Sequence, residues 1–259
     1  MLDKLNLRTI AYHLIGQPWI NDKQYLKVLV WKIFFGNRLM PILGRYSFFG
    51  QNDLDEVLAK RVSKNGFFVE VGSNDGLSFS NCKHLEMYKG WRGILIEPYF
   101  PKLADSRIHR KGRNSFIHAA IVASSFSGSK VSLYFSNLMT TLTFKSKELE
   151  NPLDHAREGE KFLGPNEKIH EFWAPAKTLK EALIEAKAPK FIDLLSLDIE
   201  GHDYEVLEDF DWSFKFRWIL VEAYDPEKFV TLLSPIGYDL VFQDQADNLL
   251  FHLNNNQVD

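Results

Sequence analysis

The chain has few of the features that mark secreted or membrane-spanning proteins. Its 259 residues include a single cysteine, Cys82, so no disulfide can form within the chain. The longest apolar run, residues 25–35, contains Lys27 and Lys32 and is too short and too charged to span a bilayer. No secretory signal is evident near the N-terminus. We therefore expect a cytoplasmic protein without a transmembrane segment.

Several motifs with known chemistry are missing as well. The sequence has no phosphate-binding GK[ST] loop, no Gly-x-Ser-x-Gly elbow and no Cys/His spacing typical of zinc. The absence of a Gly-x-Gly-x-x-Gly string disfavours a nicotinamide oxidoreductase. Basic and aromatic residues do not interleave as in nucleic-acid-binding proteins, so no nucleic-acid partner is expected.

The chain does have enough apolar residues for a packed core, and its charge is unevenly distributed. Hydrophobic residues make up 45% of the sequence, which excludes global disorder. Lys and Arg outnumber the acids through Tyr46, whereas acids prevail in the rest. Apolar residues at helical spacing predict an N-terminal helical extension over residues 1–60. Its basic face either packs as a solvated cap or makes peripheral contact with a membrane or another anionic partner.

From Phe67 onward, apolar runs alternate with helix-length segments. Strands are expected at 67–71, 92–97, 115–122, 191–198, 217–222, 237–242 and 248–253. Helices are expected at 77–88, 177–187, 203–210 and 226–234. This alternation predicts an α/β fold with a mainly parallel sheet, and the tight turn before the last strand makes the final pair antiparallel.

The pattern lapses between residues 136 and 176, in a polar stretch that contains His155, His170 and Trp173. A connection this long within a compact domain is usually a functional lid or a disordered excursion. We expect a lid-like insertion whose aromatic residues, such as Trp173, close over a substrate. The two histidines either reach the cleft from this lid or lie in solvent.

Two of the expected strands end in residues suited to a nucleotide. FFVEVGSNDG, at 67–76, breaks from an apolar run into a glycine turn, where Gly72 lets a ligand approach the backbone. GILIEP, at 93–98, ends the next strand in Glu97. An acid at this position holds the ribose hydroxyls of a nucleotide in open α/β sheets. The pair predicts a nucleoside-containing cofactor, against the alternative of an ordinary strand-to-helix turn.

Two polar residues flank this turn. Glu70 lies inside the expected strand, where a carboxylate is costly unless it meets a partner such as a ligand ammonium group. Asn81 lies on the expected helix, where it either helps to hold the glycine loop or is a surface amide.

A second group of acids follows the strands expected at 191–198 and 217–222. Asp198 ends the first of them, Glu200 and His202 come directly after it, and Glu222 ends the second. Because the carboxyl ends of parallel strands meet at one edge of a sheet, these side chains point towards the same cleft. Asp198 and Glu222 could hold a divalent cation such as Mg²⁺, or one acid could act as a general base beside His202.

These strings, in this order, resemble the FkbM family of S-adenosylmethionine-dependent methyltransferases. The resemblance covers about residues 65–253 and leaves 1–60 and 136–176 outside it. It rests on FVEVGSNDG (68–76), SNCKHLE (80–86), GWRGILIEP (90–98), LLSLDIEGHDYEVL (194–207) and ILVEAY (219–224), with Asn114, Ala119 to Ile121, Gly237 and Tyr238 beside them. The GSND turn departs slightly from the GAN-type string that is more usual in the family.

The resemblance implies a class I methyltransferase fold, which is a Rossmann-like seven-stranded sheet with an antiparallel C-terminal hairpin strand. The methyltransferase domain would span residues 61–259 and would bind S-adenosylmethionine. To Glu70, Gly72, Asn81 and Glu97, which were singled out above, the resemblance adds these expected cofactor-binding residues: Ser73, Asn74, Asp75, Pro98, Tyr99, Ala119 and Ala120. The expected catalytic residues are Asp198, Glu200 and His202.

The leading hypothesis is an O-methyltransferase that acts on a hydroxyl of a glycan or a glycosylated intermediate. A sugar hydroxyl is a poor nucleophile, so a base or a cation must make its oxygen more anionic. The rival hypothesis is a non-catalytic binding module of the same fold, which docks a partner through its basic N-terminal helices.

Overall fold

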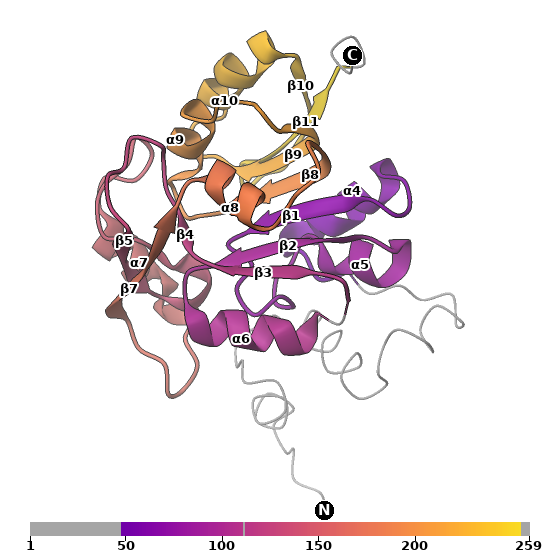
Figure 1. Ribbon diagram of the computed structural model, residues 1–259. Helices are drawn as coiled ribbons and strands as arrows, with labels where there is room; N and C mark the ends of the chain where they lie inside the picture. Colours follow the sequence, from indigo (N-terminus) through magenta and orange to yellow (C-terminus); the bar gives the residue numbers. More distant parts are fainter. Residues whose placement is uncertain (1–47, 111, 255–259) are drawn as a thin grey trace, which may run out of the picture.

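The computed structural model describes residues 48–110 and 112–254, which are built around a seven-stranded sheet (Figure 1). Its strand order is β10-β11-β9-β8-β1-β2-β3. The strands are β1 (Phe67–Val71), β2 (Arg92–Glu97), β3 (Ser115–His118), β8 (Phe191–Leu197), β9 (Lys215–Glu222), β10 (Tyr238–Gln243) and β11 (Asn248–Leu253). Only β11 runs antiparallel to its neighbours. The predicted class I fold with an antiparallel C-terminal hairpin strand is therefore confirmed.

Helices cover both faces of this sheet, and each face has its own apolar core. One face packs against α8 (Leu179–Glu185), α9 (Asp203–Glu208) and α10 (Pro226–Leu233). The other packs against α4 (Leu54–Arg61) and α5 (Lys83–Lys89), while α6 (Phe100–His109) lies against β2 and β3. Alternate residues of a strand point to opposite faces, so Val69 and Val71 enter the first core and Phe68 enters the second. Glu70 shares the face of Phe68.

A second, four-stranded sheet has the order β4-β7-β5-β6. Its strands are β4 (Ala120–Ile121), β5 (Lys130–Phe135), β6 (Thr141–Leu142) and β7 (His170–Lys177), and α7 (Pro152–Glu158) packs beside them. The strand expected at 115–122 is divided, because β3 stays beside β2 whereas β4 pairs with β7. The segment 136–176 is thus largely regular. In Figure 1 this second layer stands at one end of the main sheet.

The first helix after β1 begins later than expected. We predicted a helix over 77–88, but α5 begins at Lys83. Asp75 accepts hydrogen bonds from the backbone N–H groups of Leu77 and Ser78 at 2.9 and 2.7 Å, and Phe79 has a φ of 56°. Together these features keep residues 77–82 out of a helix. Helix α6 was not predicted, although its proline in the first turn was a signal for it.

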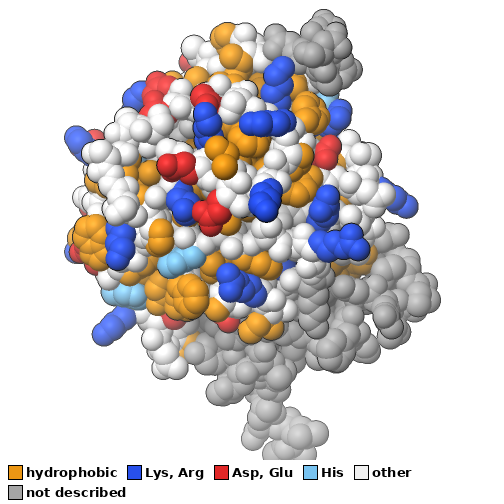
Figure 2. Space-filling model, viewed as in Figure 1, with side chains coloured by type: hydrophobic (Ala, Val, Ile, Leu, Met, Phe, Trp, Pro, Cys, Tyr) orange, Lys and Arg blue, Asp and Glu red, His pale blue; other side chains and the backbone are white. Residues whose placement is uncertain are grey.

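Of the expected N-terminal extension, only the part from residue 48 onward is described, and it contains α4, as the apolar spacing predicts. The helices expected before residue 48, and the proposed membrane contact, lie outside the described residues. Within the described residues, no helix is long and apolar enough to cross a membrane. Figure 2 shows one face of the molecule, on which Lys and Arg side chains are scattered among other types and form no continuous patch.

Candidate active site

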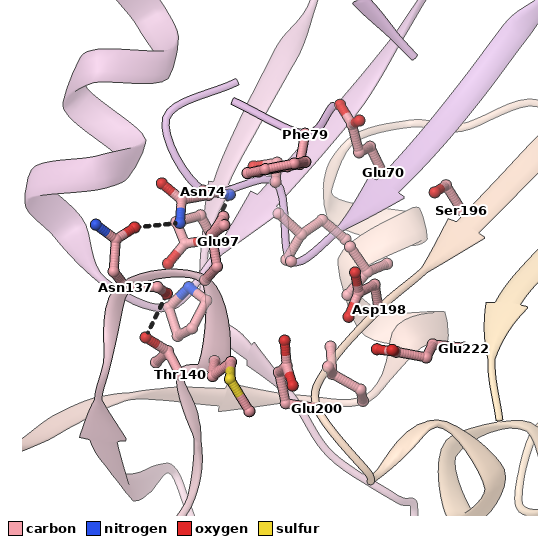
Figure 3. A pocket seen from close by; sticks show the side chains of 18 of the residues that line it. Glu70, Asn74, Phe79, Glu97, Asn137, Thr140, Ser196, Asp198, Glu200 and Glu222 are labelled. Carbon is pink, nitrogen blue, oxygen red and sulfur yellow. Dashed lines mark hydrogen bonds between the residues drawn. The ribbon is translucent and has the colours of Figure 1, made fainter. Parts of the chain in front are cut away.

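A cavity of about 320 Å³ lies where β1, β2, β8 and β9 end, and the second sheet forms its far wall (Figure 3). This volume falls within the range of small-molecule sites, roughly 300–1,000 Å³. Most of the cofactor residues expected from the sequence line it: Glu70, Gly72, Ser73, Asn74, Asn81, Glu97, Pro98, Ala119 and Ala120. Asp198, Glu200 and Glu222 line it as well. The structure therefore brings the two predicted groups of residues to one site.

The glycine turn needs its glycine for a reason that the sequence did not reveal. Gly72 has a φ of +76°, and a Cβ there would lie 1.9 Å from the carbonyl oxygen of Asp198. The backbone at the end of β8 therefore passes close to this position, and this contact alone requires a glycine. The N–H groups of Gly72 and Ser73 both donate to the carbonyl of Ile96, at 3.0 and 3.1 Å, which holds the turn against β2.

Glu97 ends β2 inside the cavity and is held by two backbone N–H groups. Asn74 donates to its Oε2 and Tyr99 to its Oε1, both at 2.8 Å. Burial raises the pKa of Glu97 to about 7, although these two hydrogen bonds act to lower it. Each carboxylate oxygen has two lone pairs, so both can still accept a hydrogen bond from a hydroxyl.

Three of the expected site residues do not line the cavity. The carboxylate of Asp75 accepts hydrogen bonds from the backbone of the loop that follows it, at Leu77 and Ser78. The ring of Tyr99 packs on Phe135 with centroids 4.2 Å apart, so only its backbone N–H serves the site. His202 lies just before α9, with its ring edge against Phe144, and burial lowers its pKa to about 4. The expected catalytic role of His202 therefore has no support from its position, because its side chain does not line the cavity.

Glu70 has a partner within the protein. Arg110 donates from Nη1 to Glu70 at 3.1 Å and from Nε to Glu86 at 2.5 Å, and all three side chains are nearly inaccessible to solvent. Ser80 donates to the second oxygen of Glu70 at 2.7 Å. The sequence predicts a partner for this carboxylate, such as a ligand ammonium group, and Arg110 is a partner within the protein. Asn81 donates to Ser196 at 3.3 Å, and its Oδ1 is buried without a hydrogen-bond partner in the described part of the chain.

Three carboxylates meet at the other end of the cavity. Asp198, Glu200 and Glu222 each offer an oxygen within 4.8 Å of the other two. Burial, followed by mutual repulsion, raises the pKa of Glu222 to about 9 and that of Glu200 well above its usual value. Burial also raises the pKa of Asp198 to about 6. We call these residues the acid cluster. Such a group is stable only when it binds protons or a cation.

Sequence reasoning only partly anticipated the residues that surround the acid cluster. His155, from α7, places its Nε2 2.7 Å from Oε2 of Glu200 and its Nδ1 3.3 Å from the hydroxyl of Tyr224. From the sequence, His155 was only one of two histidines in the insertion that could reach the cleft, and its contact with Glu200 was not predicted. Lys161 and Phe162 also line the cavity and come from the same insertion. Trp173 does not line it and is 64% exposed, so it does not cover the cavity as expected.

Comparisons with known proteins give one family match and several distant structural similarities. A family model described as "Methyltransferase FkbM domain" matches residues 70–256. Among solved structures, the chain is similar to methyltransferase FkbM from Methylobacillus flagellatus KT, with 13% identity, a TM-score of 0.44, and coverage of 95% of this chain and 58% of that one. It is also similar to a SAM-dependent methyltransferase from Aquifex aeolicus, with 10% identity, a TM-score of 0.37, and coverage of 77% and 86%. A comparison with curated proteins gives no match.

The assignment rests on the family match and not on these distant structural similarities. The matched residues include Glu70, the glycine turn, Glu97 and the acid cluster, and they make up well over half of the sequence. The chain therefore belongs to the FkbM family of S-adenosylmethionine-dependent methyltransferases.

Proposed function

We propose that this enzyme transfers the methyl group of S-adenosylmethionine to a hydroxyl oxygen of a glycan or a glycosylated intermediate. One observation carries the proposal: a single cavity has a buried acid suited to ribose at one end and the acid cluster at the other. Figure 3 shows Glu97 beside Asn74, with the acid cluster across the cavity from them. Donor and acceptor would thus meet between the two ends.

The residues at the donor end fit S-adenosylmethionine. Glu97 can accept from two ribose hydroxyls while it keeps its bonds to the backbone. Ser73 and Asn81 line the same cavity, and among the described residues Ser73 Oγ and Asn81 Oδ1 are buried with no hydrogen-bond partner, which a polar ligand could provide. Pro98 and Ala119 supply apolar surface for an adenine ring.

The residues at the acceptor end fit a hydroxyl. When bound, S-adenosylmethionine supplies a methyl group on a positively charged sulfur. A hydroxyl that takes this methyl group must lose its proton, and Asp198 is suited to accept it. Burial raises its pKa towards neutrality, which suits a general base, and its Oδ1 has no hydrogen-bond partner in the described residues. His155 would hold Glu200 beside it.

A divalent cation at the acid cluster is the alternative way to activate the same hydroxyl. Oxygen ligands from Asp198, Glu200 and Glu222 suit Mg²⁺ or Mn²⁺. A bound cation would offset the repulsion that, after burial, raises the pKa values of Glu200 and Glu222. A chelator distinguishes the two roles. Loss of transfer in EDTA with recovery in Mg²⁺ supports the cation, whereas an unchanged rate leaves Asp198 as a general base.

The acceptor is tested by following tritium from S-[methyl-³H]adenosylmethionine into a panel of glycans and glycosylated lipids. We expect label on at least one hydroxyl-bearing glycan and none with an Asp198→Asn variant. If the protein binds S-adenosylhomocysteine but labels nothing across the panel, the glycan acceptor is refuted. The binding-module alternative is not favoured, because the family match is to a methyltransferase domain.

A further inference from the structure

Asn137 connects the second sheet to the donor end of the cavity. It lies in the short 3₁₀ helix Asn137–Met139, between β5 and β6, and is buried. Its Oδ1 accepts a hydrogen bond from Nδ2 of Asn74 at 3.1 Å. Its own Nδ2 donates to the carbonyl of Phe162 and to Oε2 of Glu167, both at 2.9 Å. Figure 3 shows the two asparagine side chains facing each other beside Glu97. One amide group therefore holds three segments together.

The backbone explains why both positions carry asparagine. Asn74 has a φ of 45° and Asn137 a φ of 56°. Among residues with a Cβ, asparagine tolerates this left-handed conformation best. Thr140 fixes the second turn by donating its hydroxyl to the carbonyl of Asn137 at 2.7 Å. Glycine would keep this backbone but lose the side-chain bonds, so Asn137→Gly separates the two contributions.

The hydrogen bond between the asparagines bears directly on the ribose-binding acid. The backbone N–H of Asn74 donates to Glu97 at 2.8 Å, so the position of this residue sets one of the two bonds that orient the carboxylate. The side chain of Asn74 is fixed by Asn137 on one side, and its Oδ1 accepts from the N–H of Asp75 at 2.7 Å on the other.

We propose that Asn137 is a positioning residue of the donor site, which holds Asn74, and through it Glu97, in the arrangement that binds the ribose. The inference rests on the proposed donor site and extends it to a residue of the insertion. Asn137 itself does not need to contact the donor. On this view the insertion completes the donor site, as well as forming the wall on the acceptor side.

The test measures the affinity of the full chain for S-adenosylhomocysteine by calorimetry, which needs no acceptor. We expect Asn137→Gly to weaken binding by about threefold to tenfold, the range for losing one or two neutral hydrogen bonds. The matched control is Asn65→Gly, because Asn65 has a φ of 62° but is exposed and does not line the cavity. This control should bind like the parent protein.

A second variant makes the test independent of stability. Asn74→Gly removes the same hydrogen bond from the other side and also suits a positive φ, so it replaces Asn137→Gly if the latter fails to fold. If the bond between the two residues matters, the double variant binds no more weakly than the weaker single variant. Equal affinity of Asn137→Gly and the parent, or an equal loss in Asn65→Gly, overturns the inference. If the parent protein itself does not bind, the donor site fails, and this inference fails with it.

Discussion

The raised pKa of Glu97 makes the affinity for the donor depend on pH near neutrality. The carboxylate can accept hydrogen bonds from both ribose hydroxyls only when it is ionised. Burial in the cavity raises its pKa to about 7 in the free protein. Below that pH the group holds a proton, which must leave before the ribose is bound in this way. Affinity is therefore full above pH 7 and is lost as the pH falls through 7.

The size of the effect follows from competition between the proton and the ligand. The apparent dissociation constant rises as the ionised fraction of Glu97 falls. With a pKa of about 7, this fraction drops about tenfold between pH 8 and pH 6, so the dissociation constant should rise about tenfold. A Glu97→Gln variant cannot ionise at this position. It should bind more weakly at pH 8 and show a nearly flat profile.

Calorimetric titration with S-adenosylhomocysteine at pH 6, 7 and 8 measures both proteins. The heat of binding in buffers of different ionisation enthalpy gives a second reading, because the parent protein should release about one proton per ligand at pH 6. A flat profile in the parent protein would refute the reasoning about Glu97. The same tenfold rise in Glu97→Gln would assign the titration to another group, such as Asp198.

Three other substitutions have definite expected outcomes. His155→Ala should lower kcat by about 10- to 100-fold, because it removes the hydrogen bond that holds Glu200 at the acceptor end. The affinity for S-adenosylhomocysteine should stay unchanged. His155→Gln can keep a hydrogen bond to Glu200, so its kcat should fall less. Gly72→Ala should cost about 3 kcal/mol or more in chemical denaturation, because its Cβ would lie 1.9 Å from a backbone carbonyl oxygen. Arg110→Met should destabilise the fold by about 3–5 kcal/mol, because it leaves the buried carboxylate of Glu70 without its cation, and thermal melting would reveal this loss.

Most of the main sheet could be predicted because its inner strands, such as β1 and β2, are buried on both faces. Continuous apolar runs placed β1, β2 and β11 at the expected residues. The same local signals failed where a side chain competed with the backbone, as Asp75 does in the loop before α5. The division of the strand at 115–122 was also hidden, because the residues of β4 are as apolar as those of β3 and only their partner, β7, differs.

The acid cluster was predictable for a topological reason, whereas its surroundings were not. Parallel strands bring their carboxyl ends to one edge, so Asp198 and Glu222 had to be neighbours once β8 and β9 were assigned. The contact between His155 and Glu200 depends on α7 packing beside β5 and β6, which are far from Glu200 in the sequence. The sequence also shows that Glu70 needs a partner, but it cannot show that the partner is Arg110.

Two parts of the chain line the cavity, the main sheet and the insertion at 136–176, and we consider which of them serves the donor and which the acceptor. The strands of the main sheet and the loops after them supply Glu97 and the acid cluster, to which we assign ribose binding and activation of the hydroxyl. The insertion supplies apolar side chains, with Leu138, Met139 and Phe162 lining the cavity. If the insertion served the acceptor alone, it could change without effect on the donor. The hydrogen bond between Asn137 and Asn74 argues against such independence, because a change in the insertion that moves Asn137 also disturbs the loop that orients Glu97. Acceptor specificity in this enzyme is therefore expected to change only together with donor affinity, unless this hydrogen bond is kept.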